Sequence, residues 1–390
     1  MQELLGTVNR YRLRAGSSLS FGKTVPKRAA VQFVGSFVYQ GRLNSFCAAL
    51  VAHFMVSDEV LIVASRDAIQ RISCDGYTLE AGNSVTGPSA GEISGVAASG
   101  NSATVCYGGG IAKYSSRLSL ERDVGFGGYS NNILSVAITP DGSCIATGGG
   151  NATVTVWSRD MSPFHYLSGH TDWVRFVKFA KGHNGKLQLF STGDDGLIFL
   201  WDPLIGVMLS RLNYSYGESI HAFEVSWLDA LVAIACDSPT IALFKLEDKI
   251  VKETSSTAPL KLKKIGEISD LHHSVPTALR FSGDSQWVIS AAEDETLAVT
   301  SVYEPRSRFV CCNFITRRHC ITFMNTFTSL CVLASPPESS VIILAACASD
   351  GSVVQWVVNP TTSRSSYTKR LQLHLGALVA MDVIRNVSES

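Results

Sequence analysis

One short unit recurs along the chain and limits what it can fold into: a polar turn followed by a run of mostly apolar residues. The unit is clearest from Asp195 to Trp201 and is repeated, with the same spacing, from Asn151 to Trp157. Turn signals of this kind lie near residues 67, 109, 151, 195, 237, 294 and 350. Apolar runs bounded by Gly, Asp, Asn and Ser predict antiparallel β-strands, and no sustained 3.6-residue apolar period predicts helix.

The regular interval between the turns predicts a ring of repeated sheets. Four intervals are 42–44 residues, and the last two are 57 and 56. One four-stranded propeller blade takes about 40–45 residues, so the last two intervals hold a blade plus an insertion. Seven signals predict an all-β, seven-bladed propeller, with an eighth blade left open. Because such a ring must hide its open edge, we expect strands at 31–38 and 376–384 to share the closing blade.

Residues 166–202 resemble one blade of the WD-repeat (WD40) β-propeller family. Gly169-His170 opens this segment, and Trp201-Asp202 closes it about thirty residues later. In that family four positions form a hydrogen-bonded network that joins the loop to the strands. The resemblance implies that network for His170, Ser191, Asp195 and Trp201.

Basic residues are concentrated at the start of the chain, although the chain as a whole is neutral. Lys+Arg and Asp+Glu both number 33, so the net charge is +0 and gives no bulk attraction to nucleic acid. We expect a basic extension at 1–28 and a single propeller at 29–390, with insertions near 245–275 and 303–340. The extension has the composition of an organelle-targeting segment or of an exposed leading strand. No apolar stretch reaches the roughly 20 residues of a membrane span, and we expect the nucleus or the cytoplasm unless residues 1–28 direct the chain to an organelle.

No catalytic, metal or cofactor site is expected. Residues 87–91 (GPSAG) match G-x-S-x-G, but the helix that a nucleophile elbow needs does not follow. Cys311 and Cys312 are adjacent on a predicted strand and would point to opposite faces, which disfavours a zinc site with His319 and Cys320. The sequence therefore indicates a non-catalytic scaffold.

A narrower resemblance covers about a third of the chain. Residues 168–212, followed by 232–248 (VAIACDSPTIALFKLED), are similar to the non-catalytic WD-repeat subunit of the tRNA (guanine-N7)-methyltransferase. The resemblance implies a complex with the catalytic methyltransferase subunit, a role in 7-methylguanosine formation in tRNA, and no cofactor on this chain. Arg175 and Lys178 are the candidate partner contacts. The alternative is that these two side chains only reach solvent.

A lysine-rich stretch at 245–264 is the candidate RNA contact. Basic side chains here would attract phosphates without sequence preference. The candidate residues are Lys249, Lys252, Lys261, Lys263 and Lys264. The alternative is a solvated loop. At the level of function, the alternative is a general protein-interaction propeller in a ribosome-biogenesis, ciliary or ubiquitin-ligase assembly.

Overall fold

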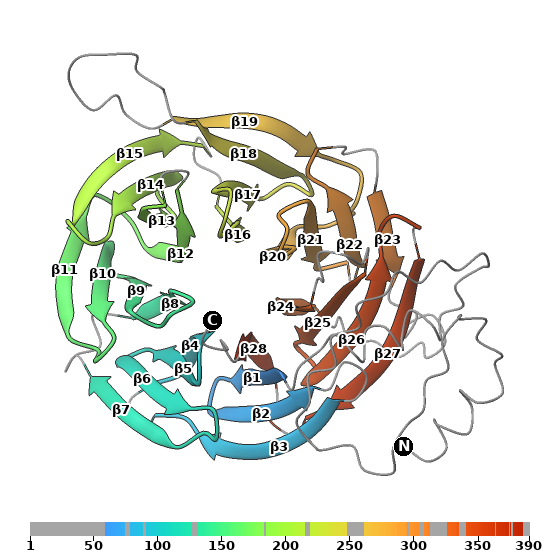
Figure 1. Ribbon diagram of the computed structural model, residues 1–390, viewed down its shortest axis with the longest axis horizontal. Coiled ribbons are helices and arrows are strands. Elements are labelled where there is room, and N and C mark those ends of the chain that lie inside the picture. Colours follow the sequence, from blue (N-terminus) through green and yellow to red (C-terminus); the bar gives the residue numbers. More distant parts are fainter. Residues whose placement is uncertain are drawn as a thin grey trace, which may run out of the picture. The chain divides into compact units, whose positions relative to one another are not determined.

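The computed structural model describes residues 59–384 apart from 75–78, 89–90, 126–131, 183–184, 215–218, 248–260, 295, 304–307, 313–325, 335–340, 363, 374 and 376. These residues form 28 strands in seven four-stranded antiparallel sheets and contain no α-helix. All of them belong to one compact unit. Figure 1 shows the sheets arranged radially in a ring, so the prediction of an all-β, seven-bladed propeller is confirmed.

The sheets are numbered as blades I–VII around the ring, each from its innermost to its outermost strand. Blade I contains β28 (Leu378–Ile384), β1 (Glu59–Ser65), β2 (Ala68–Cys74) and β3 (Leu79–Thr86), and blade II contains β4 (Ile93–Ser99), β5 (Ser102–Tyr107), β6 (Gly110–Ser115) and β7 (Leu120–Gly125). Blade III contains β8 (Ile133–Ile138), β9 (Cys144–Gly149), β10 (Thr153–Ser158) and β11 (Pro163–Ser168), and blade IV contains β12 (Val174–Lys181), β13 (Leu187–Gly193), β14 (Leu197–Asp202) and β15 (Val207–Asn213). Blade V contains β16 (Ala222–Val225), β17 (Leu231–Ala235), β18 (Ile241–Glu247) and β19 (Lys261–Ile268), and blade VI contains β20 (Pro276–Phe281), β21 (Trp287–Ala292), β22 (Thr296–Ser301) and β23 (Arg308–Cys312). Blade VII contains β24 (Phe327–Ala334), β25 (Ile342–Ala348), β26 (Ser352–Asn359) and β27 (Arg364–Gln372).

Each predicted turn lies between the two middle strands of a blade. The turn at 195 joins β13 to β14, and the turn at 67 joins β1 to β2. The other five occupy the same place in blades II, III, V, VI and VII. Because all seven blades have the same antiparallel strand order, the turn between the second and third strands lies at the same end of the ring in each.

Blade I combines strands from distant parts of the sequence. β28 pairs antiparallel with β1, with Val60 opposite Ile384. The expectation that a C-terminal strand closes the ring is therefore confirmed, and its partner among the described residues is β1. The predicted strand at 31–38 and the predicted extension at 1–28 lie outside the described residues.

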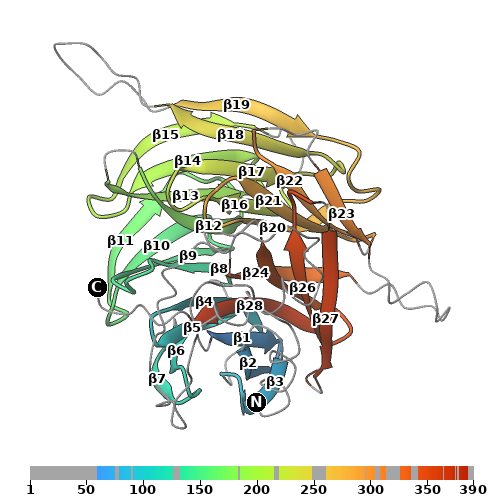
Figure 2. The same cartoon turned by 45° about the vertical axis from the view of Figure 1, so that its right-hand side comes forward.

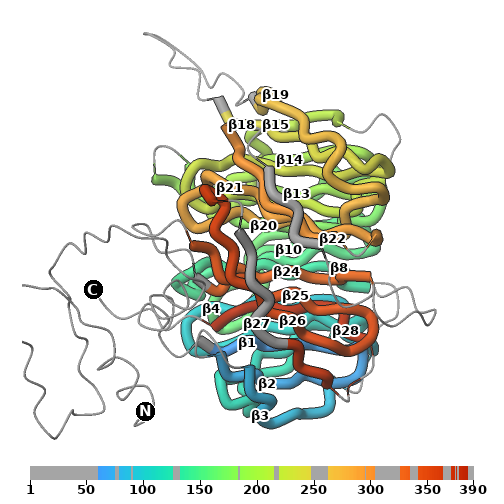
Figure 3. Tube along the Cα trace, turned by 90° about the vertical axis from the view of Figure 1, so that its right-hand side faces the viewer, coloured from blue at the N-terminus to red at the C-terminus, as the bar shows by residue number. Residues whose placement is uncertain are grey.

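Packing between neighbouring blades forms the core. The second strands of blades III, V and VII (β9, β17 and β25) are buried along their whole length. A strand that is covered on both faces reads as a continuous apolar run rather than an alternating one. Between blades III and IV, for example, Val154 and Leu167 pack with Phe199 and Trp201. Figure 2 shows the neighbouring sheets obliquely, and Figure 3 shows them from the side. The part of the chain described here holds no helix that could span a membrane.

The two predicted insertions contain regular strands. β19 falls inside 245–275, and β23 and β24 fall inside 303–340. β19 pairs with β18 from Ile241↔Ile268 to Glu247↔Lys261, so it is the ordinary outer strand of blade V. Polar and basic residues are common on outer strands that face solvent, so the sequence of such a strand can resemble an inserted loop.

Candidate functional site

Blade IV contains a continuous chain of hydrogen bonds from a loop to a strand. His170 Nδ1 lies 2.9 Å from Asp195 Oδ2, and His170 Nε2 lies 2.8 Å from Ser191 Oγ. Trp201 Nε1 donates to the same Ser191 oxygen at 2.8 Å. Asp195 also accepts the backbone N–H of Leu197 at 3.1 Å. The structure thus brings together the four residues that the resemblance pointed to.

Burial fixes this network in place. Ser191 and Trp201 are buried, and the His170 ring packs edge-on against Phe199 at 4.5 Å between ring centroids. The loop passes so close that a Cβ at Gly169 would stand 3.2 Å from ring atoms of Phe199 and Trp201. Burial raises the pKa of Asp195, but the hydrogen bond from His170 and further backbone N–H groups outweigh it and leave the pKa below its ordinary value. The network holds the turn to the blade.

The hydrogen bonds link Ser191, His170 and Asp195 in the order of a hydrolase catalytic triad. The serine, however, is not accessible to a substrate. A nucleophilic serine must reach a substrate carbonyl while its hydroxyl proton passes to the histidine. Ser191 is fully buried, and its oxygen already accepts the indole N–H of Trp201. The arrangement is suited to holding a loop, not to acyl transfer.

Arg175 lies next to this network, at the turn-bearing end of the ring. Its Nε lies 2.9 Å from both carboxylate oxygens of Asp194, and its guanidinium lies 5.2 Å from the ring centroid of Trp173. The backbone N–H of Asp194 donates to the Trp173 carbonyl, so all three residues are held together. Trp173 is 44% exposed. The Trp173–Arg175–Asp194 group therefore presents an ordered aromatic and charged surface to solvent.

Lys178 lies elsewhere, on the same strand but in a different set of contacts. Its Nζ lies 2.8 Å from Glu224 Oε2, and the same oxygen accepts a hydrogen bond from Arg280. The three residues come from β12, β16 and β20, the innermost strands of blades IV, V and VI. Burial raises the pKa of Glu224, but the two cations outweigh it and leave the pKa below its ordinary value. Lys178 therefore joins blades, and it does not act together with Arg175.

The predicted RNA contacts are divided between a strand and a segment outside the described residues. Lys249 and Lys252 lie outside, whereas Lys261, Lys263 and Lys264 belong to β19. Lys263 and Lys264 are exposed, and Lys264 Nζ lies 2.6 Å from Glu267 Oε2. The described lysines thus line the outer edge of blade V. Their contact with RNA, like the contact of Arg175 and Lys178 with a partner, remains a prediction.

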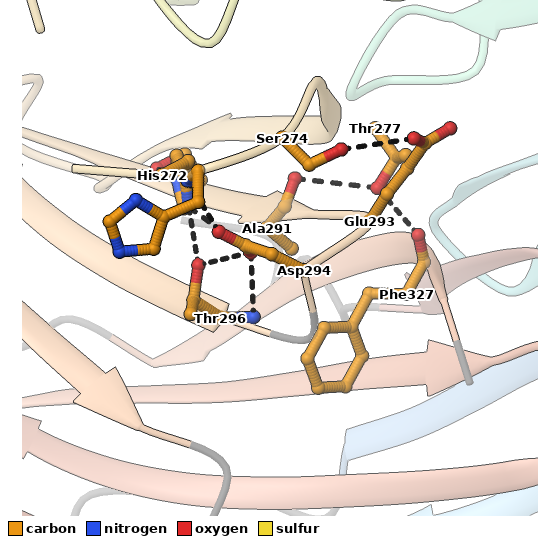
Figure 4. A network of polar contacts seen from close by, with 10 residues as sticks. His272, Ser274, Thr277, Ala291, Glu293, Asp294, Thr296 and Phe327 are labelled. Carbon is orange, nitrogen blue, oxygen red and sulfur yellow. Dashed lines mark hydrogen bonds and ion pairs between the residues drawn. The ribbon is translucent and has the colours of Figure 1, made fainter. Parts of the chain in front are cut away.

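Blade VI contains a second network that the sequence pattern did not reveal (Figure 4). His272 Nε2 lies 2.6 Å from Ser290 Oγ, and His272 Nδ1 lies 2.6 Å from Thr296 Oγ1. Thr296 in turn donates to Asp294, which also accepts the backbone N–H of His273 at 2.6 Å. The signal was Asp294, six residues before Thr300, together with a histidine in the preceding loop. The pattern was obscured because Thr300 replaces the tryptophan of blade IV.

Comparisons with known proteins agree with this architecture. Residues 122–158, 161–202 and 266–301 match the WD40 repeat (WD domain, G-beta repeat). The chain is therefore a seven-bladed β-propeller that carries WD40 repeats.

Two curated relatives and one solved structure are similar to it. WD repeat-containing protein 75 of Mus musculus is 26% identical over 52% of this chain and 23% of its own length. The Periodic tryptophan protein 2 homolog of Dictyostelium discoideum is 26% identical over 46% of this chain and 18% of its own length. These matches span less than a quarter of the relatives. The structure of U3-55K has a TM-score of 0.61 at 15% identity, covering 82% of this chain and 89% of that one, and it indicates a shared fold.

Proposed function

We propose that this chain is a non-catalytic scaffold subunit of a nuclear ribosome-biogenesis assembly. The observation that carries the proposal is the similarity, over about half of the chain, to WD repeat-containing protein 75 and the Periodic tryptophan protein 2 homolog. The fold shared with U3-55K is consistent with it. These relatives favour ribosome biogenesis over the tRNA methyltransferase complex that the sequence resemblance suggested.

The geometry supports a scaffold role. The Ser191–His170–Asp195 arrangement is buried and used for loop attachment. The ring is held by networks within blades and by ion pairs between them, such as Lys178–Glu224. A rigid surface reduces the entropy that binding costs, which suits a protein that holds other macromolecules in fixed positions.

The Trp173–Arg175–Asp194 group is the proposed contact for a protein partner. Aromatic and arginine side chains are enriched at the energetically dominant positions of protein interfaces. Here both are already ordered, because Asp194 holds Arg175 by two hydrogen bonds and Arg175 lies over Trp173. An acidic group on the partner would complete the coordination of the guanidinium.

The test is recovery of the assembly from nuclei with the full-length chain. We expect ribosome assembly factors and precursor ribosomal RNA to be recovered, and depletion of the chain to cause unprocessed precursors to accumulate. The substitution Arg175→Glu should reduce recovery, and Arg122→Glu, on the exposed outer strand of blade II, serves as the charge-matched control. Recovery of a methyltransferase with loss of 7-methylguanosine from tRNA, and with normal ribosomal RNA processing, would overturn the proposal.

A further inference from the structure

The outer strands of the seven blades differ in charge. Natural proteins place charged residues on exposed edge strands because charges discourage another strand from pairing there. Among the described outer strands, β11 alone lacks Asp, Glu, Lys and Arg. Charged residues on the other six include Glu80 on β3, Arg122 on β7, Arg211 on β15, Lys264 on β19, Arg308 on β23 and Arg370 on β27.

Apolar side chains are exposed on β11 itself. Phe164 and Tyr166 both face solvent, and Tyr166 is 67% exposed. Alternate residues point to opposite faces of a strand, so these two lie on one face and His165 and Leu167 on the other. Leu167 is buried between blades III and IV. The strand is therefore anchored on one face, while its second face and its edge are open (Figure 1).

A corner of blade IV adds exposed apolar side chains beside the same strand, on the face opposite Phe164 and Tyr166. Leu204, Ile205 and Met208, in the turn before β15 and at its start, are each more than half exposed. His165 Nε2 lies 3.0 Å from the Leu204 carbonyl oxygen. Gly206 has φ +77, and a Cβ there would stand 2.7 Å from the His165 ring, so the corner packs directly on β11. Residues 161–171 and 203–210 contain no Asp, Glu, Lys or Arg.

We propose that β11 binds an extended, uncharged and apolar segment of a partner protein, which adds to blade III as a fifth strand. Along an edge strand alternate backbone N–H and C=O groups point outward, and an extended backbone matches their spacing. A charged segment would lose water opposite a surface that offers it no counter-charge. Pro163 has no N–H, so pairing covers Phe164–Ser168. The inference is independent of the assembly to which the chain belongs.

The first experiment locates the occupant of the edge. Benzoylphenylalanine is placed at position 166 of the full-length chain in cells, and at position 120 as the control. Leu120 is an outer-strand residue that is 54% exposed, on the charged strand β7. We expect crosslinks from position 166 to a single uncharged segment of another protein, and none to that segment from position 120. Crosslinks to RNA, to a second copy of this chain, or to a charged segment would overturn the proposal, as would the absence of crosslinks.

The second experiment asks whether the contact is strand pairing. Hydrogen exchange of residues 164–168 is compared between the free chain and the recovered complex. We expect at least about tenfold slower exchange there in the complex, and no change on β7. Tyr166→Lys should lower recovery of the crosslinked protein at least about tenfold, while Leu120→Lys leaves it unchanged and both variants keep the wild-type Tm. Unchanged exchange on β11 in the wild-type complex would rule out strand addition whatever the variants do.

Discussion

Blades IV and VI both attach the preceding loop to their second strand by hydrogen bonds, but they use different side chains to do so. In both, a histidine in the loop before the blade bonds to a serine on the second strand: His170 to Ser191, and His272 to Ser290. In blade IV the histidine reaches the turn aspartate directly. In blade VI the hydroxyl of Thr296 stands between them, and His272 Nδ1 is 3.8 Å from Asp294.

The fourth position differs as well. Trp201 donates to the serine in blade IV and stacks on Phe199 at 5.2 Å between ring centroids. Thr300 takes its place in blade VI, and its buried Oγ1 has no hydrogen-bond partner among the described residues. The comparison shows that the loop-to-strand attachment does not depend on tryptophan. Tryptophan adds a large buried ring and an N–H donor in blade IV, and Thr300 supplies neither at the equivalent position of blade VI.

The largest expected difference in the free energy of unfolding is between substitutions of Trp201 in blade IV and Thr300 in blade VI. Trp201→Ala should lower the free energy of unfolding by about 3–5 kcal/mol, because it empties a large buried volume and leaves Ser191 without a donor. Thr300→Ala should cost less than about 1 kcal/mol, since the lost hydroxyl makes no hydrogen bond. Urea unfolding of the two variants measures the difference. Equal losses would mean that the two positions are equivalent.

The bridging hydroxyl of blade VI is the next test. Thr296→Val should cost about 1–3 kcal/mol, because it leaves the buried N–H of His272 unpaired. Thr296→Ser keeps the hydroxyl and is the matched control. If Val and Ser at this position are equally stable in urea, Thr296 does not connect His272 to Asp294.

The pH dependence of stability should report on His272. Burial lowers the pKa of His272, Asp294 opposes this shift, and His273 adds to it. Between the lowered pKa and the ordinary value of about 6.5, the unfolded chain binds a proton that the folded chain does not. The titration of His272 therefore leaves the free energy of unfolding unchanged above about pH 6.5 and lowers it as the solution becomes more acidic. We expect His272→Gln to flatten the profile measured between about pH 7.5 and 5.5. A profile unchanged by the substitution would contradict this.

The smallest expected effect is a gain. Thr300→Val keeps the shape of the side chain and removes a buried hydroxyl without a partner, so stability should stay equal or rise by up to about 1 kcal/mol. Thr300→Ser, which keeps the hydroxyl and loses the methyl group, should be less stable than either. A clear loss on Thr300→Val would show that the hydroxyl has a partner in solution.

The sequence predicted what repeats along the chain. The seven turns were found because a turn needs particular residues at fixed spacing, and the terminal closure followed from the need to cover a sheet edge. The Lys178–Glu224–Arg280 contact was not predicted, because its members come from three blades and no local pattern relates them. Arg175 and Lys178 are three residues apart in sequence, yet one pairs with the turn and the other with the neighbouring blade.

The position of β28 has a consequence for how the protein is made. This strand is the innermost member of a sheet whose other strands begin at residue 59. During translation the inner edge of β1, which pairs with β28 from Val60 to Ser65, therefore stays unpaired until residues 378–384 have left the ribosome. The slow closure of so long a loop makes this the step most open to chaperone assistance, and a premature stop before residue 378 would leave this edge of β1 unpaired permanently.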